Sequence, residues 1–315
     1  MRTHSQPGVA RPAAPIEMPL WGDLANDWAR SMRARNLSAN TIRIYLGALR
    51  QLADRVQLQR GEVLVTEVGR RDIEDWTANR LEFRAAGTVN AEWRGLQQFF
   101  KWLALEDEID VDPFVKLSAP IVPEAPVPVL TDDEIKTVLA GCAGKSLIDR
   151  RDTAILRLLL DTGGRLAEIG DLQTDDVDQD VQLLHVVGKG RRPRALPYGA
   201  KASDALARYL RSRKREKKAD LPWLWLAAQN RGRLEADGIK QMIARRGAAV
   251  GIANLHAHRF RHTLAHDWRA NGGNETDLMR IMGWKSPAML RRYGATVADE
   301  RAINAHRQMR RGDRI

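Results

Sequence analysis

The chain has 315 residues, which is enough for two ordinary domains that each bury a core of their own. Its 43% hydrophobic and 29% charged residues are typical of a water-soluble globular protein, no apolar run is long enough to span a membrane, and we expect no secretory signal. The single cysteine, Cys142, excludes an internal disulfide and a cysteine-based metal cluster, so we expect a reducing, cytoplasmic setting.

The positive charge is concentrated in the second part of the chain. The formal net charge is +11 and the pI is about 10.1. Residues 1–120 hold 16 basic and 16 acidic side chains, whereas residues 121–315 hold 35 and 24. A basic excess confined to one domain favours a polyanionic partner such as DNA, although a solvated basic surface would give the same count. Arginine outnumbers lysine by 40 to 11. Bidentate recognition of phosphate by arginine would explain this excess, but we favour a GC-rich genome as its cause.

The first part of the chain predicts a short tail and then a helical domain. Residues 1–16 contain three prolines and little to bury, so they predict a disordered tail. Residues 17–117 have a helical pattern, in which Ser38 can cap a helix with one apolar face: Ile42, Tyr45, Leu46, Leu49, Leu52 and Val56. Another helix runs through residues 89–103. Arg43 and Arg50 share the helix face opposite the core, where they could contact phosphate or only water.

Residues 118–128 contain four prolines and no periodic pattern, so they predict an extended linker and the clearest domain boundary in the chain. Residues 129–315 then form the second domain, where Thr131 and Glu134 make a capping box. Helical patterns cover 147–161, 165–171, 200–217, 236–249, 257–271, 274–282 and 299–310. Two short strands, Val181–Val187 and Arg194–Pro197, flank a turn at residues 188–190. The predicted fold class is mainly α with a small β-sheet: a helical domain followed by a mixed α/β domain.

Three segments of the second domain carry residues suited to phosphate chemistry. The segment Thr162–Ile169 (TGGRLAEI) delivers Arg165 after a glycine turn at the start of a helix. The segment HRFRHT places His258 and Arg261 three residues apart on one helix face. The segment GWKSP contains Trp284, and Tyr293 follows nine residues later. Each segment alone is a weak signal, but their order and spacing together are specific.

These segments resemble the arginine, His-x-x-Arg, His/Trp and tyrosine boxes of the tyrosine recombinase (phage integrase) family, over about residues 20–310. The resemblance implies a helical, SAM-like core-binding domain and a catalytic domain that together enclose duplex DNA. It implies that Arg165 and Arg261 hold the scissile phosphate and stabilise its transition state. Tyr293 would attack phosphorus and leave a 3′-phosphotyrosyl link. Two arginines and a base make sense beside a phenol of pKa ~10.

The resemblance also implies the roles of the remaining site residues. Lys189, in the turn between the strands, would protonate the leaving 5′ oxygen, and His258 would exchange a proton near the nucleophile. Trp284 occupies the position usually held by histidine, where its indole N–H could donate to phosphate. The neighbouring Arg191 and Arg192 are further candidates for contacting DNA. Glu168 is expected to support the site without acting as a catalyst, and neither ATP nor a metal is implied.

One rival pattern is a row of histidines, His258, His262 and His266, at the i, i+4 and i+8 spacing of metal ligands on a helix. Arg259 and Arg261 lie between them, and cations repel a divalent metal, so we do not predict a metal site.

The expected partners are double-stranded DNA with specific recombination sites, three further protomers in a homotetramer, and accessory DNA-bending or directionality factors. Strands would be exchanged through a Holliday junction by a nucleoid-associated protein. The pattern around Trp284 favours an integrase of a mobile element over a recombinase that resolves chromosome dimers. A type IB topoisomerase and a DNA-binding regulator without activity are the alternatives from other classes.

Overall fold

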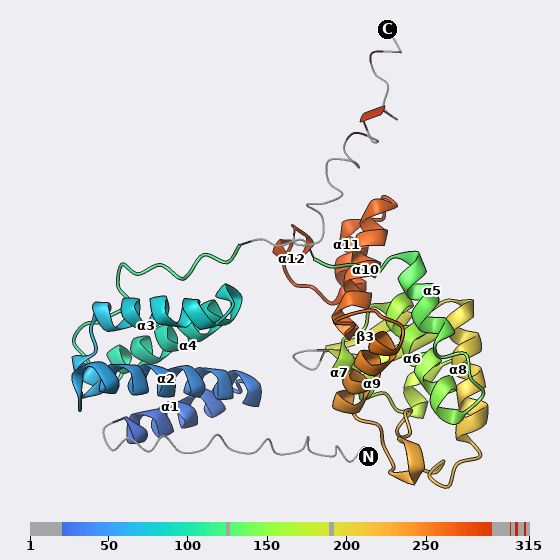
Figure 1. The fold of residues 1–315 in the computed structure, drawn as a ribbon, viewed down its shortest axis with the longest axis horizontal. Coiled ribbons are helices and arrows are strands. Elements are labelled where there is room, and N and C mark those ends of the chain that lie inside the picture. Colours follow the sequence, from blue (N-terminus) through green and yellow to red (C-terminus); the bar gives the residue numbers. More distant parts are fainter. Residues whose placement is uncertain are drawn as a thin grey trace. The chain divides into compact units, whose positions relative to one another are not determined.

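The computed structural model describes residues 21–123, 127–188 and 192–291, together with residues 303, 306, 307 and 312. The chain divides into two compact units, Met1–Glu124 and Ala125–Ile315 (Figure 1). The expected tail at 1–16, Lys189, Arg191 and Tyr293 lie outside the described residues, as does most of the expected helix at 299–310. Within the described ranges, no helix is both long and apolar enough to cross a bilayer.

The first unit is built from helices packed around one aromatic core. These are α1 (Gly22–Ala34), α2 (Ala39–Arg60), α3 (Arg70–Phe83) and α4 (Ala86–Leu105), with the short 3-10 turn η1 (Val65–Glu67) before α3. The predicted cap of α2 is confirmed, because the Ser38 hydroxyl accepts a hydrogen bond from the Thr41 amide at 3.1 Å. Trp28, Leu52 and Phe99 are almost fully buried where α2 packs against α1 and α4.

The proline-rich segment is hydrogen-bonded to the first unit near its start, and the residues just after it are hydrogen-bonded to the second unit. On the first unit, the Asn90 side chain on α4 donates to the Pro120 carbonyl at 2.8 Å. On the second unit, the Leu130 amide donates to the Thr263 hydroxyl at 2.8 Å. The division between the units therefore falls between these two anchoring points.

The second unit is mainly helical and carries one small sheet. Its helices are α5 (Asp132–Ala140), α6 (Leu147–Thr162), α7 (Leu166–Gly170), α8 (Ala200–Arg213), α9 (Ala236–Ala249), α10 (Ala257–Ala270), α11 (Glu275–Met282) and α12 (Ala288–Arg291). The strands β1 (Val177–Asp178), β2 (Leu183–Gly188) and β3 (Arg192–Pro197) form an antiparallel sheet in the order β1-β2-β3. Two 3-10 turns, η2 (Thr174–Asp176) and η3 (Ala228–Asn230), complete it. The predicted fold class is confirmed.

The register of β2 and β3 decides which of their side chains face the core. Leu184 pairs with Leu196 and Val186 pairs with Arg194, and directly paired residues lie on the same face of a sheet. Leu184, Val186 and Leu196 are buried in the main core of the unit, which α6 and α8 also line. Of these four residues only Arg194 is charged, and the register therefore places it on the inner face of the sheet.

Candidate active site

The turn before Arg165 is stabilised by the Thr162 hydroxyl and formed by Gly163 and Gly164. Helix α6 ends at Thr162, whose hydroxyl donates to the Leu158 carbonyl at 2.6 Å and accepts from the Gly164 amide at 3.1 Å. Gly163 has a φ of 54°, in the left-handed region that favours glycine, and a Cβ there would lie 2.9 Å from the Met282 methyl. The chain reverses within these residues and Arg165 becomes the N-cap residue of α7, as the sequence predicts.

Glu168 joins two arginines below this turn. Its carboxylate accepts from the Arg165 amide at 2.7 Å, from the Arg165 guanidinium at 2.8 Å and from the Arg194 guanidinium at 2.6 Å. Burial by itself would raise the pKa of Glu168, but the hydrogen bond from the Arg165 amide, the charge of Arg194 and the hydrogen bonds from both guanidiniums outweigh burial and hold the pKa below its ordinary value. Glu168 is therefore a carboxylate that positions two cations and leaves the group with a net positive charge.

Three guanidinium groups meet the carboxyl-terminal end of α11. The three donor–acceptor pairs are Arg194 with the Ile281 carbonyl, Arg261 with the Met282 carbonyl, and Arg165 with the Gly283 carbonyl at 3.2 Å. The last carbonyls of a helix have no partner inside the helix, and they form the negative end of its dipole. The arginines therefore bind this helix end and fix the start of the loop that contains Trp284.

Arg261 is the most deeply buried of these three arginines. It projects from α10, is 4% exposed, and donates to the Gly163 carbonyl at 2.6 Å. Its guanidinium carbon lies 5.4 Å from the centre of the Trp284 ring, within the range of a cation–π contact. Arg261 thus ties the turn before Arg165 to the loop after α11.

His258 lies one helical turn before Arg261, on the side of α10 that reaches the surface. Its pKa is lowered by desolvation and then by the positive charges of Arg261, His256 and Arg165. The ring centre is 5.9 Å from that of His262. At neutral pH the imidazole of His258 is therefore uncharged and able to accept a proton.

Trp284 packs at the base of the loop that follows α11. The ring is 8% exposed and lies in a small apolar cluster with Ala265, Leu278, Met282 and Leu290. Its amide donates to the Met279 carbonyl at 2.9 Å, which closes the helix end. Its place next to Arg261 is compatible with both packing and hydrogen bonding.

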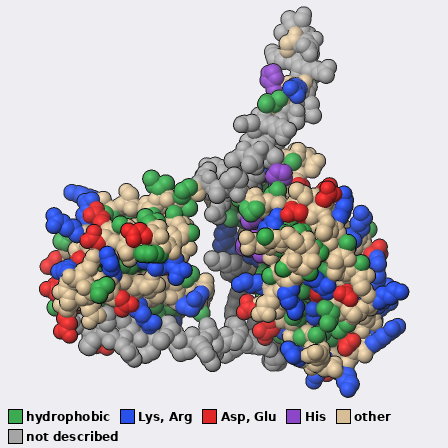
Figure 2. Space-filling view, viewed as in Figure 1, with side chains coloured by type: hydrophobic (Ala, Val, Ile, Leu, Met, Phe, Trp, Pro, Cys, Tyr) green, Lys and Arg blue, Asp and Glu red, His purple; other side chains and the backbone are tan. Residues whose placement is uncertain are grey.

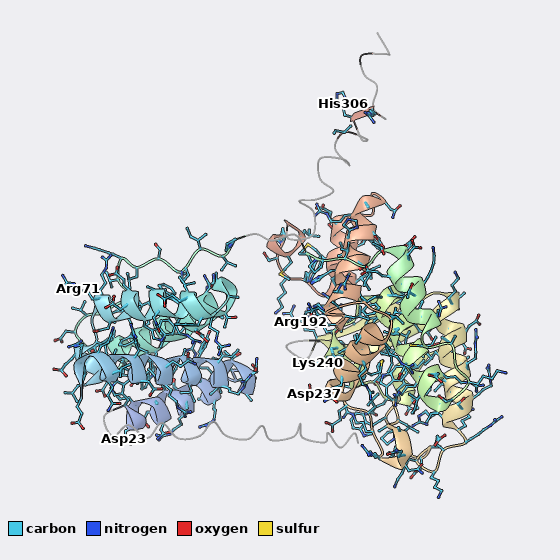
Figure 3. The ribbon with its side chains drawn as sticks, in the orientation of Figure 1. Asp23, Arg71, Arg192, Asp237, Lys240 and His306 are labelled. Carbon is cyan, nitrogen blue, oxygen red and sulfur yellow. The ribbon has the colours of Figure 1, made fainter. Side chains whose placement is uncertain are left out.

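The other residues singled out from the sequence fall in three places. Lys189, Arg191 and Tyr293 lie outside the described residues, but Gly188 is described, and a Cβ on it would lie 3.3 Å from the Glu168 carboxylate. Gly188, the last described residue before Lys189, therefore lies beside the arginine cluster. Arg192 pairs with Gly188 and is exposed at the start of β3 (Figure 3).

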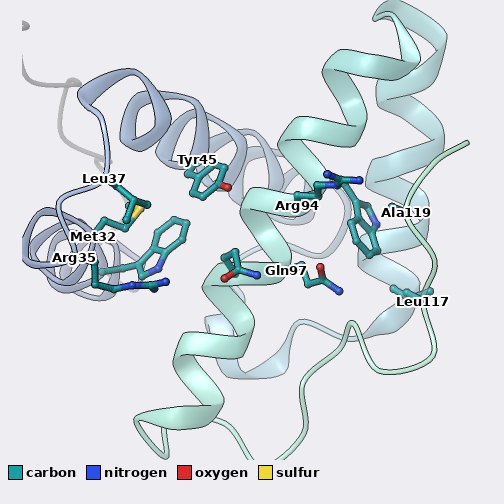
Figure 4. Close-up of a pocket in the computed structure, with 11 residues that line it drawn as sticks. Met32, Arg35, Leu37, Tyr45, Arg94, Gln97, Leu117 and Ala119 are labelled. Carbon is teal, nitrogen blue, oxygen red and sulfur yellow. The ribbon is translucent and has the colours of Figure 1, made fainter. Parts of the chain in front are cut away.

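Arg43 and Arg50 belong to α2 of the first unit and not to this cluster. Arg43 is exposed and donates to the Asn40 side chain at 2.6 Å, and Arg50 is partly buried. A cavity of about 500 Å³ in the same unit is lined by Trp28, Arg35, Tyr45, Arg94 and Gln97, among others (Figure 4). These side chains offer hydrogen-bond donors and ring faces, which suit binding and not bond cleavage.

Two arginines of the second unit were missed as members of the site. From the sequence, Arg194 is only the first residue of a predicted strand, yet it binds both Glu168 and α11. Arg269, two turns after Arg261 on α10, is 7% exposed and donates to the Leu290 carbonyl at 2.8 Å, three residues before Tyr293. The i, i+8 spacing of Arg261 and Arg269 is the signal that could have found the second.

Arg259, the first arginine of the HRFRHT segment, is buried on a different side of α10. It donates to the Val129 carbonyl at 3.1 Å and to the Glu134 carboxylate, so it fastens the chain before α5. Among the described residues, no group of three or more His, Cys, Asp or Glu side chains is arranged to hold a metal ion.

Comparison with known proteins gives the same class as the geometry. The model of the phage integrase family matches residues 128–300, and that of the phage integrase N-terminal SAM-like domain matches residues 24–110. Tyrosine recombinase XerC of Corynebacterium efficiens is 27% identical over 270 residues, covering 85% of this chain and 84% of the relative. Tyrosine recombinase XerC of Thermodesulfovibrio yellowstonii is 30% identical over 212 residues, covering 65% and 70%.

Solved structures show the same fold. The Tn1549 transposon integrase, in complex with circular intermediate DNA, has a TM-score of 0.69 at 23% identity and covers 89% of this chain and 98% of its own. The lambda integrase dimer bound to a COC′ core site has a TM-score of 0.67 at 14% identity, covering 86% and 94%.

The chain belongs to the phage integrase family. It is a site-specific recombinase of the tyrosine type, an enzyme that breaks and rejoins DNA strands, and the function expected from the sequence is confirmed.

Proposed function

We propose that Arg165 and Arg261 hold the scissile phosphate of a DNA duplex while the Tyr293 hydroxyl attacks its phosphorus. The observation that carries the assignment is the convergence of the Arg165, Arg194 and Arg261 guanidiniums at the end of α11, with Glu168 between two of them. Such an arrangement is rigid and positively charged before the substrate arrives. A preorganised cationic site stabilises the charge that develops on a phosphoryl group in the transition state.

The chemistry requires a proton acceptor and a proton donor beside these cations. The P–O5′ bond breaks as the Tyr293 oxygen bonds to phosphorus, so the 3′-phosphotyrosyl link conserves the energy for rejoining. His258, neutral because its pKa is lowered, takes the tyrosine proton. Lys189, in the turn that begins next to Glu168, donates a proton to the 5′ oxygen. No step of this scheme draws on ATP or a metal ion.

Recombination needs two DNA sites held together, so we propose that four protomers assemble on two specific sites and exchange strands through a Holliday junction. Accessory DNA-bending or directionality factors, and a place on the nucleoid, belong to the same proposal. The solved relatives support it, since the XerH recombinase was captured with a palindromic difH substrate and lambda integrase as a dimer on a core site. In the first unit, Arg43 of α2 is exposed, which supports a contact of its side chain with backbone phosphate.

Two biological settings are consistent with this activity. The sequence around Trp284 favours integration and excision of a mobile element. The relatives named XerC and XerD, which this chain matches over most of their length, favour resolution of chromosome dimers as the second candidate.

The experiment that tests the proposed function is mapping of recombination junctions in cells that express the protein. Junctions that recur at one sequence, and that vanish in a Tyr293→Phe strain, support recombination and distinguish its setting. Relaxed plasmids without any new junctions would contradict it and indicate a type IB topoisomerase.

A further inference from the structure

A second concentration of positive charge lies far from the arginine cluster, at the end of α8. Residues 208–218 (RYLRSRKREKK) contain seven basic side chains and a single acid, Glu216, so these eleven residues carry six of the eleven net positive charges of the chain. Six of the cations are exposed, and they define the α8 basic patch: Arg208, Arg211, Lys214, Arg215, Lys217 and Lys218.

Within the described structure, no cation of the α8 basic patch forms an ion pair. Arg208 donates only to the backbone carbonyl of Asp204 in its own helix, at 3.3 Å. Exposed cations elsewhere do have acidic partners, for example Arg70 with Glu74 at 2.9 Å and Lys136 with Asp133 at 3.1 Å. The charge of the patch is therefore not neutralised locally.

The seventh cation, Arg213, holds the patch in shape. It is 4% exposed and donates to four backbone carbonyls of the segment that follows the helix: Leu224 at 3.1 Å, Ala219 at 3.0 Å, Leu221 at 2.6 Å and Trp223 at 2.8 Å. Because Arg213 ties the end of α8 to the backbone that follows Lys218, the exposed cations are presented from an ordered turn. An ordered surface loses less conformational entropy when it binds.

The patch faces away from the active site of its own unit. Helix α6 packs against both α8 and α10, and α8 lies at the opposite edge of the unit from α7 and β3 (Figure 1). Lysine and arginine side chains gather along this edge in the space-filling view (Figure 2). A duplex held at Arg165 therefore leaves the α8 basic patch available.

We propose that the α8 basic patch binds the phosphate backbone of a second DNA segment, apart from the duplex in the active site. Protein interfaces are enriched in aromatic anchors and depleted in lysine, whereas the exposed side chains of residues 208–218 are all cations. Phosphate contacts need only such cations, and they give affinity without sequence preference. In an assembly that joins two sites, flanking DNA is the segment available to this surface.

The test uses the full-length chain and a bridging assay. The protein, carrying Tyr293→Phe so that cleavage plays no part, is loaded on an immobilised duplex and offered a second, fluorescent duplex of unrelated sequence. The test variant adds Arg215→Gln, Lys217→Gln and Lys218→Gln. The matched control instead adds Arg30→Gln, Arg70→Gln and Lys136→Gln, three exposed cations that have acidic partners.

The proposal predicts that the test variant loses capture of the second duplex, whereas the control keeps it and both melt at the same temperature. Three phosphate contacts give a slope of about −2.7 when the logarithm of the affinity is plotted against the logarithm of the salt concentration. Raising the salt concentration fourfold should therefore weaken capture by the control about 40-fold more than any residual capture by the test variant. Capture that is equal in the two variants overturns the proposal. Two other results also overturn the proposal, because each would assign the patch to a protein partner. One is a test variant that bridges the two duplexes normally but no longer binds poly-glutamate, an acidic polypeptide. The other is a test variant that loses self-association in the absence of DNA.

Discussion

The Arg194 guanidinium lies 2.6 Å from the Glu168 carboxylate, although the two residues are 26 positions apart and on different elements. Both side chains are nearly buried, with 12% and 4% exposed. Through this contact β3 supports the carboxylate that also positions Arg165. Strand β3 therefore contributes to the arginine cluster by holding Glu168 in place.

Replacing Arg194 tests this support. Arg194→Gln should leave Glu168 with one cationic partner, and removing one partner of a buried ion pair typically costs about 3–5 kcal/mol. We expect a loss of that size in urea unfolding and a slower single-turnover cleavage of DNA. Arg192→Gln, two residues away and exposed, is the control and should change the free energy of unfolding by less than about 0.5 kcal/mol. Equal losses of stability in the two variants would show that Arg194 is not a positioning residue.

The lowered pKa of His258 makes a prediction about pH. If neutral His258 accepts the tyrosine proton, the cleavage rate should fall on acidification only when pH drops through the folded pKa, which lies below the ordinary pKa of histidine. The sign is the same for stability: a depressed pKa contributes stability above the unfolded value that is lost as pH falls through the folded one. Single-turnover rates from pH 5 to 8 check this, with His258→Gln as the variant that lacks the acid limb. An acid limb centred above pH 7 would contradict the assignment.

Trp284 should show two separable contributions. If its indole N–H donates to the phosphate, Trp284→His should retain part of the rate and Trp284→Phe should lose about ten- to a hundredfold, because a hydrogen bond to a charged group contributes roughly 1.5–3 kcal/mol. Trp284→Ala should be slowest and should also lose about 3–5 kcal/mol of stability, since the ring is buried in its cluster. Cleavage rates read beside melting temperatures distinguish the two. If the Trp284→Phe enzyme cleaved as fast as the wild type, the Trp284 ring would contribute only packing and the predicted hydrogen bond to phosphate would be wrong.

Removal of the first unit should weaken DNA binding without removing the arginine cluster. A fragment of residues 126–315 keeps the core of the second unit and all contacts of Arg165, Arg194 and Arg261. We expect lower affinity, weaker discrimination between sites and a shallower salt slope, because the fragment lacks the phosphate contacts proposed for the first unit. Binding measured by gel shift at several salt concentrations checks this. A fragment that binds its site as tightly as the full chain would argue against a two-domain clamp.

The helical part of the fold could be predicted because its signals are local. The 236–249 helix has the expected bounds, and the caps at Ser38 and Thr131 follow from adjacent residues. Strand β1 has only two residues, which is too short to show an alternating pattern, and the first expected strand began two residues early because residues 181 and 182 form a turn.

The roles of Arg194 and of the α8 basic patch depend on information that is not local. Arg194 is one of three arginines in a short segment, and only the pairing with Val186 turns it inward. In the same way, the sequence shows the size of the positive charge in the second unit, but the packing of α8 decides that more than half of it faces away from the site.

The central claim is that Tyr293 forms the covalent bond to DNA at the arginine cluster, and one measurement tests it directly. The wild-type protein and Tyr293→Phe are incubated with a nicked suicide substrate in the presence of a chelator, and covalent adducts are resolved on a denaturing gel. We predict an adduct with the wild type and none with Tyr293→Phe, with DNA binding nearly unchanged because only one hydroxyl is removed. An adduct that persists in Tyr293→Phe, or a wild-type adduct that forms only when a divalent metal is added, would contradict the account.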